Sequence, residues 1–336
     1  MIKKTLYFGN PAYLSMKNSQ LVIKLPEVEK NDTLPESFKV ETVRTVPIED
    51  IGVVVMDNPR ITFTNGLMNA LLENNCALIT CDSKSMPSGL MLPLESNTTQ
   101  SERFLAQIEA SLPLKKQLWQ QTVKAKIENQ AFVLKTYCNN EINNMLQWAS
   151  NVKSGDSDNL EGRAAAYYWK NIFSSTDKYS IENQKTIKNK KNGTTENKLV
   201  IPFFTRDRNG MPPNNLLNYG YAILRAVVAR SLVVSGLLPT LGIHHHSRYN
   251  AYCLADDIME PYRPFVDQLV IEIINKVSDF SELTKEIKGA LLQIPVIDVI
   301  INEQRSPLMI AAAQTTASLA KCYLGEIRKI SYPEFG

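Results

Sequence analysis

The sequence predicts an α+β protein, with a β-sandwich-like N-terminal domain followed by a mostly α-helical C-terminal domain. Three observations support this prediction. The chain has 336 residues, which is at or past the comfortable size of one hydrophobic core, so two domains are expected. The first hundred residues are divided into short runs rich in β-branched and aromatic residues. The later residues show helical periodicity instead.

Seven runs in the first hundred residues have the composition of β-strands and are separated by Gly, Pro, Asn and Asp. They are TLYFGN, AYLSMKN, QLVIKL, ETVRTVPI, IGVVVMD, ITFT and CALITCD. One helix is expected between the last two, in NGLMNALLENN, because Leu67, Leu71 and Leu72 share a helical face. We expect this β-rich domain to span residues 1–95 and a polar linker to span residues 96–102.

The second domain is expected to span residues 103–336 and to contain a long helix that begins near Pro113, a residue favoured in the first helical turn. The apolar face of this helix is expected at Leu118, Val123, Ile127 and about Phe132. Its lysines are expected largely on other faces: Lys115, Lys116, Lys124 and Lys126.

Further helices are expected towards the C-terminus. In NNLLNYGYAILRAVVARSLVVSG, apolar residues recur at steps of three and four, and Gly236 is placed to end the helix. The tail, residues 295–324, is expected to be largely helical.

The charge distribution places any polyanion-binding surface in the second domain. Residues 1–100 carry 9 basic and 11 acidic side chains, a net charge of −2, and residues 101–336 carry 28 and 23, a net charge of +5. Residues 176–198 are polar and lysine-rich, so we interpret them as a mobile surface loop. Their lysines could contact phosphates, and a solvated loop is the alternative.

The composition argues against several classes of protein. Five scattered cysteines without a C-x-x-C pair argue against a disulfide framework or zinc knuckle and favour a reducing cytoplasm. No signal peptide is apparent, and the most apolar stretch, residues 222–238, is interrupted by Arg225, Arg230 and Ser235, so no membrane association is expected. Phosphate-loop, dinucleotide-binding, nucleophile-elbow and H-E-x-x-H motifs are absent from the sequence.

All three histidines of the chain are consecutive: His244, His245 and His246. Asp257 and Glu260 follow at a spacing of three, which places both carboxylates on one face of a helical turn. One imidazole with oxygen ligands suits Mg²⁺ or Mn²⁺ better than zinc. Alternatively, each histidine is an ordinary hydrogen-bonded residue of a polar loop. The two acids could likewise lie at a solvated or salt-bridged helix end.

Such a metal site needs a further carboxylate, and Glu161 is a candidate. It is followed by small residues that allow close backbone approach and then by three aromatic residues. The alternative is that D-x-x-E, from Asp158 to Glu161, forms a variant of the capping box in which Glu161 caps its own helix.

Three separate blocks of the sequence resemble the CRISPR-associated integrase family, the first and universal protein of spacer acquisition. They are TLYFGNPAYLS, LEGRAAAYYW and PPNNLLNYGYAILRAVVARSLVVSGLLPTLGIHHHSRYNAYCLADDIMEPYRP, and they occur in the family's order. GNPAYLS and GIHHHS look most like the type II form, which partners a single-protein effector nuclease.

The resemblance implies a metal-dependent catalytic domain in residues 103–336. In the family, a Glu of the EG-x-AA block, a His of the G-x-x-H block and an acid of the D-x-x-E-P-x-R-P block bind a divalent metal. Carried over, these residues are Glu161, His245 and Glu260, with Mg²⁺ or Mn²⁺ as the cofactor. Asp257 matches an acid that lies near the metal in some members. The two flanking histidines receive no role.

The resemblance also implies the reaction and the partners. The family inserts short foreign DNA fragments into the CRISPR array, by attack of the fragment's 3′-hydroxyl on a phosphodiester of the repeat. The resemblance implies a homodimer whose two copies are joined through their β domains. Two dimers assemble with a second spacer-acquisition protein into a heterohexamer that binds double-stranded DNA, both the prespacer fragment and the repeat.

Arg206, Arg208 and Arg248 are candidates for phosphate contacts, with ordinary surface arginines as the alternative. Two other functions stay open at this point. One is a metal-dependent nuclease that acts on branched or single-stranded DNA without integration. The other is a non-catalytic DNA-binding scaffold, which the three separate ligand-type blocks disfavour.

Overall fold

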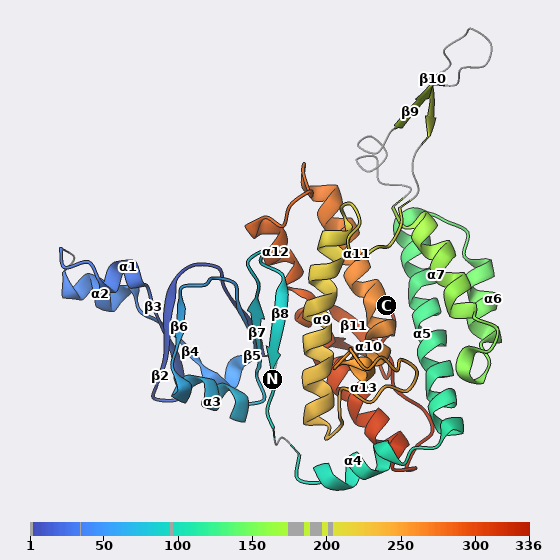
Figure 1. Ribbon diagram of the computed structural model, residues 1–336, viewed down its shortest axis with the longest axis horizontal. Coiled ribbons are helices and arrows are strands. Elements are labelled where there is room, and N and C mark those ends of the chain that lie inside the picture. The colour runs from blue at the N-terminus through green and yellow to red at the C-terminus, as the bar shows by residue number, and fades with distance from the viewer. Residues whose placement is uncertain (1–2, 34, 95–96, 174–184, 189–196, 201–203) are drawn as a thin grey trace.

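The structure is a computed structural model with a β-rich N-terminal domain and a helical C-terminal domain, as predicted (Figure 1). It describes residues 3–33, 35–94, 97–173, 185–188, 197–200 and 204–336. In Figure 1 the β domain lies on the left and the helices on the right, and α9 stands between the two.

The N-terminal domain consists of two four-stranded sheets. The first has the order β1 (Lys4–Phe8), β5 (Ile51–Met56), β7 (Ala77–Cys81), β8 (Pro87–Met91). The second has the order β4 (Arg44–Pro47), β3 (Gln20–Lys24), β2 (Ala12–Lys17), β6 (Ile61–Phe63). Three helices complete the domain: α1 (Pro26–Glu29), α2 (Glu36–Thr42) and α3 (Asn65–Glu73).

Strand β5 explains how the two domains are joined. From Val53 to Val55 its side chains alternate between two cores, as the period of a strand requires: Val53 and Val55 belong to the core of the helical domain, and Val54 to the core of the β domain. Ile51 also belongs to the core of the β domain, because the pairing of β5 with β1 is irregular between Ile51 and Val53. The valine-rich sequence of β5 is therefore buried on both faces, which is typical of a strand with parallel neighbours.

The helical domain is built around α9, and most of the residues of this helix are buried. Its principal helices are α4 (Gln100–Ile108), α5 (Leu112–Cys138), α6 (Asn143–Asn151), α7 (Leu160–Asn171), α9 (Asn214–Val234), α10 (Cys253–Met259), α11 (Arg263–Lys276), α12 (Lys285–Leu291) and α13 (Leu308–Tyr323). Short 3-10 turns are η1 (Ile48–Asp50), η2 (Ser154–Asp156), η3 (Glu260–Tyr262) and η4 (Ile294–Val296).

Helix α9 is the one described helix that is long and apolar enough to cross a membrane. Of its most apolar window, 67% is buried inside the protein, as expected for a core helix that packs against neighbours on all sides.

The two strongest helix predictions are confirmed. Helix α5 begins after Ser111, whose hydroxyl accepts a hydrogen bond from the backbone N–H of Leu114. Helix α9 ends just before Gly236, which has a positive φ of 70°. The lysine prediction for α5 is wrong at one position: Lys126 is only 8% exposed, because it faces two acids from other elements.

The prediction of a largely helical tail is also wrong in part. A hairpin, β11 (Asp298–Ile301) and β12 (Gln304–Pro307), precedes α13. Its two turn residues, Asn302 and Glu303, both have positive φ, the conformation that a tight two-residue hairpin requires. Strand β8 and helices α1 and α2 were not predicted, and α4 begins at Gln100, inside the expected linker.

Within the lysine-rich segment, residues 176–198, two short strands are described, β9 (Lys185–Lys188) and β10 (Asn197–Val200), and they pair in antiparallel fashion. The other residues for which a mobile loop was predicted lie outside the described residues.

Candidate active site

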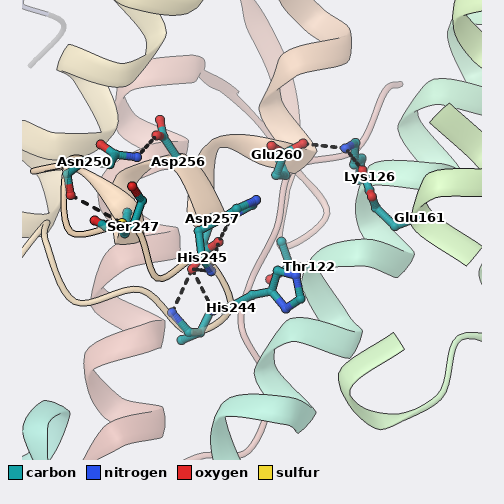
Figure 2. A network of polar contacts seen from close by, with 12 residues as sticks. Thr122, Lys126, Glu161, His244, His245, Ser247, Asn250, Asp256, Asp257 and Glu260 are labelled. Atoms are coloured by element: carbon teal, nitrogen blue, oxygen red, sulfur yellow. Dashed lines mark hydrogen bonds and ion pairs between the residues drawn. The ribbon is translucent and has the colours of Figure 1, made fainter. Parts of the chain in front are cut away.

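Two predicted acids, Glu161 and Glu260, come together around the buried side chain of Lys126. The Lys126 Nζ forms an ion pair with Glu161 Oε1 and lies 2.6 Å from Glu260 Oε2. Figure 2 shows Lys126 directed towards Glu260 on one side and Glu161 on the other. The three residues come from three elements, α5, α7 and η3, so the site exists only in the folded chain.

The start of α7 leaves the Glu161 side chain free for this contact. Asn159 is the N-cap residue and accepts from the N–H of Gly162, and the Asp156 carboxylate accepts from the N–H groups of Leu160 and Glu161 at 2.9 and 3.0 Å. Since these two side chains satisfy the helix terminus, Glu161 is not needed as a cap.

The capping-box alternative for Glu161 is therefore wrong. Asp158 is not the cap either, because its carboxylate pairs with Lys153 Nζ at 2.8 Å.

Glu260 is held at the junction of α10 and α11. Its Oε1 pairs with Arg263 at 3.0 Å, and the side chain of Asn129 on α5 donates to the backbone carbonyl of Pro261 at 2.8 Å. Asn129 lies one helical turn beyond Lys126, so α5 fixes both the backbone and the carboxylate of this turn. Of the two alternatives for this acid, the solvated helix end is wrong, because Glu260 is 5% exposed, and the salt-bridged helix end is confirmed, because Glu260 pairs with Lys126 and Arg263.

The electrostatics keep this cluster charged. Burial lowers the pKa of Lys126, but the carboxylates of Glu260 and Glu161 raise it more, so the net pKa lies above its ordinary value. Burial raises the pKa of Glu260, but Arg263 and Lys126 together hold that pKa below its ordinary value. Glu260 and the two cations, Lys126 and Arg263, thus remain ionised side by side.

Asp257 organises the histidine loop. It is fully buried and accepts backbone N–H groups of Ile243 and His244 at 2.7 and 2.9 Å, and of His245 at 3.2 Å. It also contacts Nδ1 of the His245 ring. A Cβ on Gly242 would lie 2.4 Å from the His245 carbonyl and 2.8 Å from Asp257, so only glycine allows this tight loop.

The contact with Asp257 orients the His245 ring. When Nδ1 donates to the carboxylate, Nε2 is left as the ring nitrogen with a free lone pair, the arrangement typical of a metal ligand. This hydrogen bond also raises the pKa of His245 above its ordinary value.

The flanking histidines differ from His245. His244 stacks on the indole of Trp119, with ring centroids 4.1 Å apart and planes 2° apart, and burial lowers its pKa. His246 is exposed. Trp119 also meets the His245 ring edge-on at 5.7 Å, so this buried aromatic supports the loop. The sequence analysis assigns no functional role to Trp119 or Lys126. Both lie on the buried face of α5, and this position in the helical repeat is the signal that could have indicated them.

The donor set fits a divalent metal. Glu260 Oε2 is buried and accepts no directed hydrogen bond; its one close cation is Lys126. Two carboxylates and an oriented imidazole are ligands suited to Mg²⁺ or Mn²⁺. Glu260 lies close enough to His245 to influence its pKa. Among the described residues, however, no three His, Cys, Asp or Glu side chains already form a metal-binding cluster.

Two of the three predicted phosphate-binding arginines lie together. Arg206 and Arg208 line a cavity of about 780 Å³ between the β7–β8 turn and α9. Arg225 and Arg263 line it as well, and Asp82 is the acid of the lining. Arg263 also contacts Glu260, so the cavity adjoins the acid cluster.

Arg248 lies apart from this cavity, on the exposed histidine loop, with its guanidinium 4.7 Å from the ring of Tyr249.

The whole fold matches solved structures of DNA-processing proteins. A casposase bound to an integration product matches with a TM-score of 0.71 and 20% identity, over 98% of this chain and 92% of that chain. A Cas6-RT-Cas1–Cas2 complex matches with a TM-score of 0.67 and 19% identity, over 97% of this chain and 35% of that chain. These likenesses define the class of fold, the two-domain fold shared by casposases and Cas1 proteins.

The chain belongs to the Cas1 family. The family model for CRISPR associated protein Cas1 matches residues 6–302. The CRISPR-associated endonuclease Cas1 of Neisseria meningitidis serogroup C is 35% identical over 319 residues, which are 95% of this chain and 91% of that relative. The family resemblance found in three sequence blocks is thus confirmed, and with it the class of enzyme, a CRISPR-associated endonuclease and integrase.

Proposed function

We propose that Glu161, Glu260 and Nε2 of His245 bind Mg²⁺ or Mn²⁺, and that this site joins a DNA fragment to the CRISPR repeat. The observation that carries the proposal is the convergence of two carboxylates, the buried one of Glu260 and the partly exposed one of Glu161, on one ammonium group, beside a histidine oriented by Asp257. Two elements that are far apart in sequence supply the acids. Lys126 and Arg263 balance these like charges in the structure, and a divalent ion can take the place of the ammonium group between them.

The chemistry follows from what the residues hold. When bound, the metal polarises a phosphoryl oxygen and lowers the pKa of the attacking 3′-hydroxyl. Glu161 and Glu260 supply the negative charge that holds the ion, and Asp257 keeps His245 in the tautomer that presents Nε2. The nucleophile belongs to the DNA, so the protein needs no activated serine or cysteine. One of the cysteines, Cys322, is in any case a poor nucleophile, because burial raises the pKa of its thiol to about 11.

The arginine-lined cavity is the proposed path of the DNA strand. Arg206 and Arg208 would bind backbone phosphates there, as expected from the sequence, and Arg225 and Arg263 extend the positive surface. Since Arg263 contacts both the cavity and Glu260, a phosphate bound in the cavity would lie next to the metal site. Arg248 would contact DNA from the separate histidine loop.

The partners proposed are those of the family. Residues 1–95 would join two copies into a homodimer, with residues 96–102 as linker and residues 103–336 as the catalytic domain. A second spacer-acquisition protein would complete a heterohexamer on double-stranded DNA, and the match to a Cas6-RT-Cas1–Cas2 complex supports this assembly. We also propose the type II form, with its effector nuclease as a partner, and action in the cytoplasm.

The test is an integration assay. A labelled fragment with free 3′-hydroxyls is incubated with the protein, its companion protein, Mn²⁺ and a supercoiled plasmid that carries the repeat. The expected result is label joined to the plasmid by the wild type and none by Glu161→Gln or Glu161→Ala, with Glu128→Gln on α5 as the matched control.

Two outcomes would contradict the proposal. Cleavage of the plasmid without joined label would indicate a nuclease that does not integrate. Equal integration with and without a chelator would indicate that no metal takes part.

A further inference from the structure

Lys126 lies where a metal bound by both acids would have to lie. Its ammonium group meets Glu161 Oε1 and Glu260 Oε2, and the residue is 8% exposed. We propose that Lys126 is an internal cation that competes with the divalent metal for these two carboxylates, and so weakens metal binding by the DNA-free protein. This inference rests on the metal site proposed above.

The competition follows from the oxygens involved. A divalent ion coordinates carboxylate oxygens at about 2.0–2.2 Å, and an ammonium group approaches the same oxygens to about 2.7–2.9 Å. The other oxygen of Glu260 pairs with Arg263 at 3.0 Å. A divalent ion and an ammonium group held between the same two carboxylates repel each other, so the metal is expected to displace the Lys126 ammonium from at least one of the two acids.

Charge balance gives the same result. Glu161, Glu260 and the Asp257 carboxylate beside His245 contribute −3, and Lys126 and Arg263 contribute +2, so the formal charges sum to −1 with His245 neutral. A divalent ion added to this sum leaves a net charge of +1 beside the buried Glu260 and Asp257, whereas the sum without Lys126 would be zero, so the lysine makes metal binding less favourable. Phosphates of bound DNA would supply the missing negative charge. Metal binding is thus expected to be weak until DNA occupies the adjoining cavity.

Lys126 is distinct from the other lysines of α5. Lys124, two residues away, is exposed and its ion pair, 3.8 Å to Glu128, is to a residue on the same helix. Replacement of Lys124 removes the same charge from the same helix without touching the acid cluster. It is the matched control for replacement of Lys126.

The experiment is a Mn²⁺ titration of the full-length, DNA-free protein, read by calorimetry and by the electron paramagnetic resonance of free Mn²⁺. Lys126→Met is expected to bind Mn²⁺ at least tenfold more tightly than the wild type, and Lys124→Met as the wild type does. The added variant Lys126→Met/Glu161→Gln is expected to lose the gain. If Lys126→Met does not fold, Lys126→Gln keeps a neutral donor and is measured in its place.

The outcomes separate the two proposals. Mn²⁺ binding by the Lys126 variant that is no tighter than in the wild type, yet is lost with Glu161→Gln, would overturn the competition and leave the metal site standing. Mn²⁺ binding that is indifferent to Glu161→Gln in every background would overturn the metal site itself, and the competition with it.

Discussion

Lys288 and Lys126 are both buried lysines paired with carboxylates, but their surroundings differ. Lys288 on α12 lies 2.8 Å from Asp57, and the Tyr7 hydroxyl donates to the same carboxylate at 2.6 Å. One cation thus meets one anion, at the contact between the helical and β domains. Lys126 instead meets two anions from two other elements, with Arg263 beside them.

The difference separates a structural pair from a chemical site. The charges of Lys288 and Asp57 cancel, and the Tyr7 hydroxyl donates a further hydrogen bond to the Asp57 carboxylate. This pair therefore needs no additional ion. The cluster around Lys126 places two carboxylates together, which is costly without cations and useful where a cation must bind. The comparison predicts that changes in the first region alter stability and that changes in the second alter chemistry.

The largest effect is expected for Glu260→Gln. Loss of this negative charge removes a proposed metal ligand, so integration should fall by about a thousandfold or more, in line with the loss of a central catalytic group. The integration assay measures this effect, and circular dichroism confirms the fold. Asp57→Asn is the matched control because it replaces a carboxylate in the structural pair. Integration by Glu260→Gln within tenfold of the wild type would contradict the claim that the cluster around Lys126 is a chemical site.

The second effect is on stability. Lys288→Met leaves the Asp57 carboxylate buried without its cation, which should lower the free energy of unfolding by about 3–5 kcal/mol. Urea denaturation measures this change. Integration per folded molecule should remain within a factor of about three of the wild type, since the ion pair of Lys288 is with Asp57 and not with a proposed metal ligand. A stable variant with impaired integration would show that this pair, too, belongs to the reaction.

Asp267 is a third buried acid that can be compared with Asp57 and Glu260. Two neutral groups, the hydroxyls of Tyr168 and Tyr221, donate hydrogen bonds to its carboxylate. Burial raises the pKa of Asp267 from 3.8 to about 6. The folded state then binds the proton more tightly than the unfolded state, so the contribution of Asp267 to stability is fully present only below about pH 4 and is lost as the pH rises through about 6. This contribution should fall by about 2 kcal/mol between pH 4 and pH 6, and by about 3 kcal/mol in all.

Urea denaturation at a series of pH values measures this contribution. Asp267→Asn should flatten the profile between pH 4 and 6. If the stability of the wild type changed over this pH range in the same way as that of Asp267→Asn, the expectation would be contradicted.

The smallest effect is expected for Asp257→Asn. An amide can still accept the backbone N–H groups of the histidine loop, but it no longer anchors the Nδ1–H of His245 as a carboxylate does. Integration and Mn²⁺ affinity should fall by about 10- to 100-fold, as for other partners of metal-binding histidines. His246→Ala, on the exposed neighbour, should leave both unchanged. Equal losses in the two variants would show that the loop, and not the orientation of His245, matters.

The sequence predicted the order of the domains and the central helices because those depend on local patterns. Helix α9 has a regular apolar repeat and a glycine at its end, and α5 has a capping serine. The hairpin β11–β12 was missed because its strands are only four residues long and polar at their ends. Such strands are stable only through their contacts with the rest of the domain.

The candidate site was predicted in part. Family motifs pointed to Glu161, His245 and Glu260, and the spacing of Asp257 matched an acid near the metal. Its place on the buried face of α5 distinguishes Lys126 from the four other lysines of this helix, but its role depends on acids 35 and 134 residues further along the chain, which no local pattern shows. The stacking of Trp119 on His244 is equally a property of the folded chain alone.

The most direct measurement is anomalous diffraction from a Mn²⁺-soaked crystal of the protein with bound DNA. The account predicts one strong Mn²⁺ peak bounded by Glu161, Glu260 and Nε2 of His245, with the Lys126 ammonium moved away from at least one acid. A peak held by His244 or His246, or no peak between the two acids while Lys126 still bridges them, would contradict it.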